Sequence, residues 1–164
     1  QVVNLIDKYF KRAEPGKIIF HSEKTRELLN KQKPVDPVIL NKVKINLNAQ
    51  GYDVRQDQAT DEYLESRGKE AQIIASNEKT LVCLHTKLSA SGLFEELVHL
   101  NQIKKMKEYS IKHNDTDVIE NEIKAKEKVL KHRKSYNITE DEVAFLEKSI
   151  NQYRRELNEI RNKN

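Results

Sequence analysis

The spacing of apolar residues along the chain separates an early part of mixed periodicity from a late part that is helical throughout. In 71–76 (AQIIAS) and 80–86 (TLVCLHT), short apolar runs flank the turn-forming NEK and predict two strands joined as an antiparallel hairpin. After residue 89 the apolar residues recur every three or four positions. This spacing predicts three long helices over about 90–109, 116–134 and 139–163.

The residues before the hairpin alternate short helical patterns with short strand patterns. Pro37 near the start of one pattern and Gly51 just after its end are typical helix boundaries. The predicted elements are a helix over 1–12, a strand at 17–21 (KIIFH), helices over 22–32 and 36–51, an edge strand at 52–56 (YDVRQ), and a short helix over 59–68 capped by Thr60. The fold class that follows is α+β: a small antiparallel sheet with flanking helices over 1–89, and a helical layer over 90–164, in a single domain.

The last predicted helix carries its own start signal. Thr139 followed by Glu142 is a capping box, in which each side chain bonds the other residue's backbone N–H. The apolar residues that follow alternate spacings of three and four, as in a helix that packs along its length. Leu146 and Ile150 are therefore predicted to be buried against the two preceding helices.

Composition narrows the function classes without choosing one. The net charge of +4, from 30 basic and 26 acidic residues, does not establish nucleic-acid binding. The single cysteine, Cys83, excludes an internal disulfide and a multi-cysteine zinc site, and its strand context predicts a buried inert thiol. No apolar run approaches the roughly 20 residues of a membrane helix. The chain opens on Gln1 and is interpreted as the C-terminal part of a longer protein.

The stretch LFEELVHLNQ, residues 93–102, combines a buried pattern with three titratable groups. Its apolar residues fall on nearly every side of a helix, yet it carries Glu95, Glu96 and His99. Glu95 and His99 are four residues apart and share one helical face. This is the spacing at which the H-E-x-x-H motif binds zinc, with the acid between the ligands as general base. Glu95 and His99 are thus candidate metal ligands, and Glu96 is the candidate base.

A third ligand is predicted on the next helix. Glu122 falls inside the apolar arc of VIENEIKAKEKVL, and a buried carboxylate is costly unless it is paired or binds a metal. We therefore expect the carboxylates of Glu95 and Glu122 within about 5 Å of His99, close enough to share one ion. The alternative is a local Glu95–His99 pair, with Glu122 bonded to Lys126 or to a lysine of another helix.

Residues 69–130 resemble zincin-like metallopeptidases of the glutamate-ligand type, in which an H-E-x-x-H helix is followed by a helix bearing Asn-Glu. Glu96 and His99 match the base and second ligand, Asn121-Glu122 matches the Asn-Glu, and Glu95 departs from the first histidine. The chain also looks like C-terminal domains of bacterial polymorphic toxins and phage head-protein fusions. The resemblance implies a hydrolase that uses zinc or another divalent metal on a protein or peptide. It also implies delivery within a larger secreted or phage-associated protein and a cognate immunity protein. No membrane partner is expected, since no apolar run is long enough to span a membrane.

Two other functions stay open from the residues alone. One is a metal-free nuclease toxin domain that uses His99, Glu96 and His85; the other is a non-catalytic helical module that binds a protein. His85 ends a predicted strand, where it is either an acid–base group or a surface histidine. Six basic residues cluster in 124–134 and are predicted to spread across the outward face of the second long helix, as a solvated face or as a phosphate-binding stripe: Lys124, Lys126, Lys128, Lys131, Arg133 and Lys134.

Overall fold

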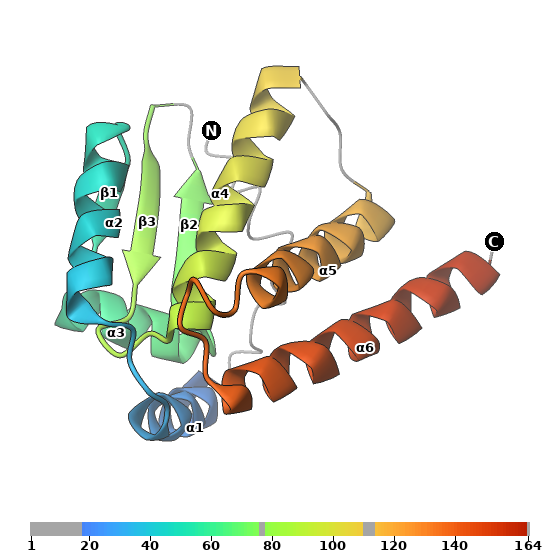
Figure 1. Ribbon diagram of the computed structural model, residues 1–164, viewed down its shortest axis with the longest axis horizontal. Coiled ribbons are helices and arrows are strands. Elements are labelled where there is room, and N and C mark those ends of the chain that lie inside the picture. The colour runs from blue at the N-terminus through green and yellow to red at the C-terminus, as the bar shows by residue number, and fades with distance from the viewer. Residues whose placement is uncertain (1–17, 76–77, 110–113, 164) are drawn as a thin grey trace. The chain divides into compact units, whose positions relative to one another are not determined.

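The α+β class is confirmed by the structure, a computed structural model that describes residues 18–75, 78–109 and 114–163 (Figure 1). The helix predicted over 1–12 lies outside the described residues. Contacts divide the chain into two compact units, Gln1–Leu93 and Phe94–Asn164. No helix among the described residues is long and apolar enough to cross a membrane.

The described residues of the first unit form three helices and three strands, and two predictions about their boundaries were wrong. The strand predicted at 17–21 was wrong because a helix begins at Ile18, where the short apolar run continues without a glycine or proline into the helical pattern after it. The short helix is capped by Asp57, whose carboxylate accepts a hydrogen bond from the backbone N–H of Thr60 at 2.8 Å. The elements are α1 (Ile18–Lys31), α2 (Pro37–Ala49), β1 (Asp53–Arg55), α3 (Gln58–Ser66), β2 (Ala71–Ala75) and β3 (Thr80–Leu84).

The sheet has the strand order β1-β3-β2 and is mixed. The predicted hairpin is confirmed, since β2 and β3 pair antiparallel with Ile73 opposite Val82. The edge position of β1 is also confirmed, but β1 pairs parallel with β3, so the sheet is not purely antiparallel as predicted. β1 and β3 can run in the same direction because α3 and β2 lie between them in the sequence and bring the chain back to the end of the sheet at which β1 begins.

Apolar side chains from the sheet and from α3 form the core of the first unit. Leu64, Ile73 and Leu84 have no exposed surface, and Val82 has almost none. Cys83 is a buried free thiol, as predicted. α2 packs on β1, and α3 contacts both α1 and β3.

The start of α4 (Ala90–Tyr109) depends on a glycine. The Ser89 hydroxyl accepts a hydrogen bond from the backbone N–H of Gly92, and the Glu70 carboxylate accepts one from the backbone N–H of Ser89. The Glu70 carboxylate occupies the space that a Cβ atom on Gly92 would need. A side chain at residue 92 would therefore displace Glu70 from the first turn of α4.

The second unit contains most of α4 together with α5 (Asp115–Lys131) and α6 (Glu140–Asn162). These are the three longest helices of the described chain, as predicted. The capping box of Thr139 and Glu142 is confirmed, and α5 has a second one formed by Asn114 and Asp117. Leu146 is buried, as predicted.

Helices α5 and α6 run alongside one another (Figure 1). An apolar cluster packs between them, and ion pairs join their exposed sides. Arg154 of α6 bonds Glu127 of α5 at 2.9 Å, and Arg161 bonds Glu120. The turn between the helices is held by Tyr136, whose ring stacks on Phe94 of α4 with centroids 3.7 Å apart. The cluster consists of Ile123, Ile150 and Leu157, which are buried, with Ile119, Leu130 and Tyr153 packed against them.

Candidate metal centre

Three predicted ligands converge in the second unit. Glu95 and His99 of α4 and Glu122 of α5 each offer one ligand atom, and the three atoms lie within 4.8 Å of one another. The predicted proximity is therefore confirmed. The four-residue spacing puts Glu95 and His99 on one face of α4, and Glu122 lies on the buried face of α5, where it is 4% exposed.

The orientation of His99 is fixed by its hydrogen bonds. Its Nδ1 lies 2.9 Å from Oε1 of Gln102, and Nε2 of Gln102 donates to the backbone carbonyl of Asn121 at 3.2 Å. A carbonyl only accepts, so the amide group of Gln102 must face it with its NH₂ and face His99 with its oxygen. His99 Nδ1 therefore carries a proton, and Nε2 is directed towards Oε1 of Glu122, 3.2 Å away.

A buried lysine holds the two carboxylates of this cluster. Nζ of Lys126 lies 2.9 Å from Oε1 of Glu95 and 3.0 Å from Oε2 of Glu122, and it sits 5.3 Å from the ring centroid of Tyr153. Lys126 is only 6% exposed, so its predicted place on the outward basic face was wrong. It lies one turn after Glu122 and therefore on the same buried face.

The ionisation states follow from these neighbours. Burial alone would lower the pKa of His99, but the carboxylates of Glu122, Glu96 and Glu95 raise it to about 9. Burial would raise the pKa of Glu122, but His99 and Lys126 lower it to about 2. Burial likewise opposes the charge of Lys126, yet the two carboxylates it contacts raise its pKa. In the absence of a metal, His99 is an imidazolium at neutral pH within a network of paired charges.

The donor set also fits a divalent metal. One imidazole nitrogen and two carboxylates are acceptable zinc ligands. His99 Nε2 and Glu122 Oε1 are buried, and neither makes a hydrogen bond of ordinary geometry with a described residue. The Nδ1–H of His99 leaves Nε2 as the ligating atom once its proton is lost. Metal binding therefore requires loss of that proton and movement of Lys126 away from Glu95 and Glu122.

Glu96, the candidate base, is buried beside this cluster. It is 7% exposed, and its charge contributes to the raised pKa of His99. This agrees with the predicted placement of a second acid next to the Glu95–His99 face. Its role as general base stays a prediction.

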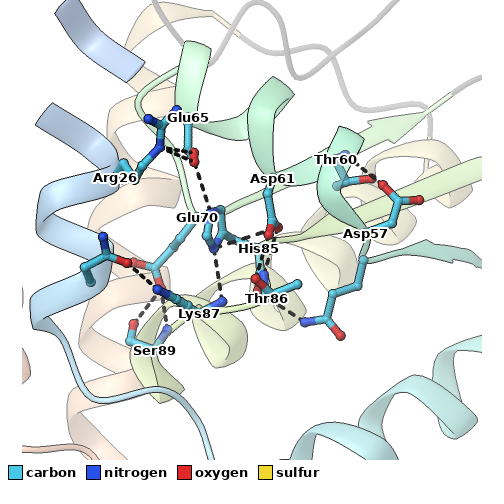
Figure 2. Close-up of polar contacts among 12 residues, drawn as sticks. Arg26, Asp57, Thr60, Asp61, Glu65, Glu70, His85, Thr86, Lys87 and Ser89 are labelled. Carbon is cyan, nitrogen blue, oxygen red and sulfur yellow. Dashed lines mark hydrogen bonds and ion pairs between the residues drawn. The ribbon is translucent and has the colours of Figure 1, made fainter. Parts of the chain in front are cut away.

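His85, the other candidate catalytic residue, lies in the first unit in a separate polar cluster (Figure 2). It is 4% exposed, so the surface-histidine interpretation was wrong: the strand end is covered by α3. Its Nδ1 accepts a hydrogen bond from the backbone N–H of Lys87 at 3.0 Å, and its Nε2 lies 3.8 Å from Oε1 of Glu65. Glu65 is in turn paired with Arg26. His85 thus has structural partners of its own, and its catalytic role stays a prediction.

Two residues of the cluster were missed by the sequence analysis in the roles they hold. Gln102 orients His99, and Tyr153 covers Lys126. A signal existed for Gln102, because it follows His99 by three residues and so lies on the adjoining helical face. For Tyr153 the pattern indicated only an apolar position of the last helix.

No family model, curated protein sequence or solved structure matches the chain. The resemblance to zincin-like metallopeptidases therefore stays a prediction. What supports it is the arrangement of Glu95, His99 and Glu122.

Proposed function

We propose that Glu95, His99 and Glu122 bind a divalent metal, zinc in the first instance, and that the protein is a zincin-like hydrolase of peptide or related amide bonds. The observation that carries the proposal is the convergence of one buried imidazole nitrogen and two carboxylates, with one ligand atom from each of Glu95, His99 and Glu122 lying within 4.8 Å of the other two. An imidazole and two carboxylates this close together are a donor set that a divalent metal can bind.

Each residue of the cluster has a separate role in the proposed reaction. A bound metal would supply a Lewis acid that polarises the carbonyl of the substrate. Glu96 takes a proton from the attacking water and returns it to the leaving amine. Gln102 keeps Nε2 of His99 directed into the cluster through its bond to Nδ1. Lys126 must leave the carboxylates before the metal enters, which makes it a competitor for the site.

Metal titration of the purified chain after treatment with a chelator tests the proposal. We expect one equivalent of zinc, or of cobalt read by its visible absorption, to bind the wild type and Glu96→Gln, and binding to be lost in His99→Ala and Glu122→Gln. Glu127→Gln is a matched control, since Glu127 is exposed on the same helix outside the cluster. Peptide hydrolysis should be lost in Glu96→Gln alone among the metal-binding variants. Zinc binding that survives His99→Ala would contradict the proposal.

Lys126 favours a second candidate function, a non-catalytic helical module that binds a protein. Its ammonium group already pairs with both carboxylates, so the helices of the second unit need no metal to balance these charges. If this second function is correct, the purified chain binds no stoichiometric metal, and Lys126→Met lowers the free energy of unfolding without raising the affinity for metal.

A further inference from the structure

Five cations on α5 and the turn after it are exposed and have no acidic partner within 4 Å among the described residues. Two acids of α5, Glu120 and Glu127, pair instead with Arg161 and Arg154 of α6. Within 124–134, the charged side chains without an ion pair among the described residues are therefore all positive. These five cations, called the basic patch here, are Lys124, Lys128, Lys131, Arg133 and Lys134.

The basic patch has a regular geometry. Lys124, Lys128 and Lys131 follow an i, i+4, i+7 spacing and form one stripe along α5, about 10 Å long at 1.5 Å per residue. Arg133 and Lys134 continue it into the turn, where both line a hollow of about 590 Å³ and a neighbouring one of about 570 Å³. Each hollow also has one acid in its lining: Glu127 in the first, where it is paired with Arg154, and Glu140 in the second.

The turn presents these cations from a fixed backbone. The backbone N–H of Ile138 donates to the carbonyl of Arg133 at 2.9 Å, and that of Tyr136 donates to the carbonyl of His132 at 2.9 Å. The stacking of Tyr136 on Phe94 anchors the turn to α4. The backbone that carries Arg133 and Lys134 is therefore ordered before a ligand binds, which lowers the entropy cost of binding to that of the side chains.

The helix dipole explains only part of the patch. Basic residues in the last turn offset the partial negative charge of a helix C-terminus, and Lys128 and Lys131 do so on α5. Lys124 lies before that turn, and Arg133 and Lys134 lie beyond it. Three of the five cations therefore have no role in stabilising the helix.

We propose that the basic patch binds the phosphodiester backbone of duplex nucleic acid without reading its sequence. A stripe of about 10 Å matches roughly three charges of one strand, which are spaced about 3.4 Å along the axis. Single strands are typically held by base stacking on aromatic rings. Among the described residues, no phenylalanine or tyrosine lines either hollow, and the ring of Tyr136 is engaged by Phe94, so the surface favours a duplex.

The test is the salt dependence of binding to a fluorescently labelled 20-base-pair duplex, measured by polarisation with the full chain. If all five cations contact phosphates, the slope of log K against log salt is about −4.5, and affinity falls about 500-fold between about 50 and about 200 mM salt. The triple variant Lys124, Lys128, Lys131→Gln keeps two contacts. Its affinity should fall only about 12-fold over the same range, and it should bind more weakly at low salt.

A second triple variant provides the matched control. Lys148, Arg155 and Lys163→Gln removes the same net charge from α6 and its C-cap, outside the basic patch. We expect its salt slope to equal that of the wild type. Equal slopes for the two triple variants would overturn the proposal, because binding would then follow net charge. Absence of duplex binding at low salt, or equal affinity for polyglutamate and the duplex, would overturn it as well.

Discussion

Lys126→Met should change the stability of the metal-free chain and its affinity for zinc in opposite directions. The ammonium group lies 2.9 and 3.0 Å from two carboxylates, and the side chains of Lys126 and Glu122 are almost fully buried. Removing one partner of a buried ion pair costs about 3–5 kcal/mol, because the remaining charge stays buried without compensation. The carboxylate of Glu95 is partly exposed and can be hydrated, so we expect about 3 kcal/mol.

The same substitution opens the ligand cluster to a cation. Without Lys126, zinc can neutralise Glu95 and Glu122 without first displacing the ammonium group that binds them in the wild type. At a zinc concentration of about 100 times Kd, binding stabilises the folded state by about 2.7 kcal/mol, which recovers most of the loss. We therefore expect zinc to raise the denaturation midpoint of Lys126→Met by more than that of the wild type.

The assay is urea denaturation followed by circular dichroism, with chelator and with zinc. Lys124→Met is the matched control, since residue 124 is exposed on the same helix and should change stability by less than about 0.5 kcal/mol. A variant that is unfolded in chelator and folds on addition of zinc would agree with the reasoning. Equal midpoints for Lys126→Met and the wild type in chelator would refute it, and so would equal stabilisation of both by zinc.

Three further predictions concern stability. In chelator, the contribution of His99 to the free energy of unfolding should be complete below pH 6.5 and should be lost, by about 3 kcal/mol, as pH rises through about 9, because the folded state keeps a proton that the unfolded state loses. Urea midpoints measured across this range should depend less on pH in His99→Gln, and a flat wild-type profile would contradict the assignment. Gly92→Ala should destabilise the chain by about 1–2 kcal/mol, although alanine normally stabilises a helix by about 1 kcal/mol relative to glycine. The loss should be smaller in a chain that also carries Glu70→Ala, and additive effects of the two substitutions would refute the contact. Leu146→Ala should cost about 2–5 kcal/mol in thermal or urea unfolding, against little change for Phe145→Ala, which is exposed; an unchanged midpoint would mean that α6 does not pack through Leu146.

Much of the second unit could be predicted from sequence because its signals are local. The capping box at Thr139 and Glu142 fixes a helix start within four residues, and regular apolar spacing fixes which face is buried. The same spacing is enough to place Glu122 on the buried face of its helix. Helical geometry brings Glu95 and His99 to one side of α4, so the three candidate ligands could be named from spacing alone.

What could not be predicted depends on contacts between distant residues. The burial of Lys126 depends on two carboxylates. The i, i+4 spacing to Glu122 indicated one of these contacts as an alternative, but the contact with Glu95 joins two different helices and has no signal in the sequence. The parallel pairing of β1 depends on the path of the chain through α3, which strand propensity does not encode. A histidine at a strand end, such as His85, is usually exposed, and only the packing of α3 covers it.

The two ion pairs between α5 and α6 also restrict how far the helices can slide along each other. Glu120 and Glu127 are two turns apart on α5, and their partners Arg161 and Arg154 are two turns apart on α6 in the reverse order. An antiparallel pair shifted by one turn would bring the carboxylate of Glu127 opposite Ile150 or Asn158. Apolar packing alone tolerates such shifts, since leucine and isoleucine recur with nearly the same period. The ion pairs thus select one alignment of the α5–α6 hairpin among those that apolar packing would tolerate.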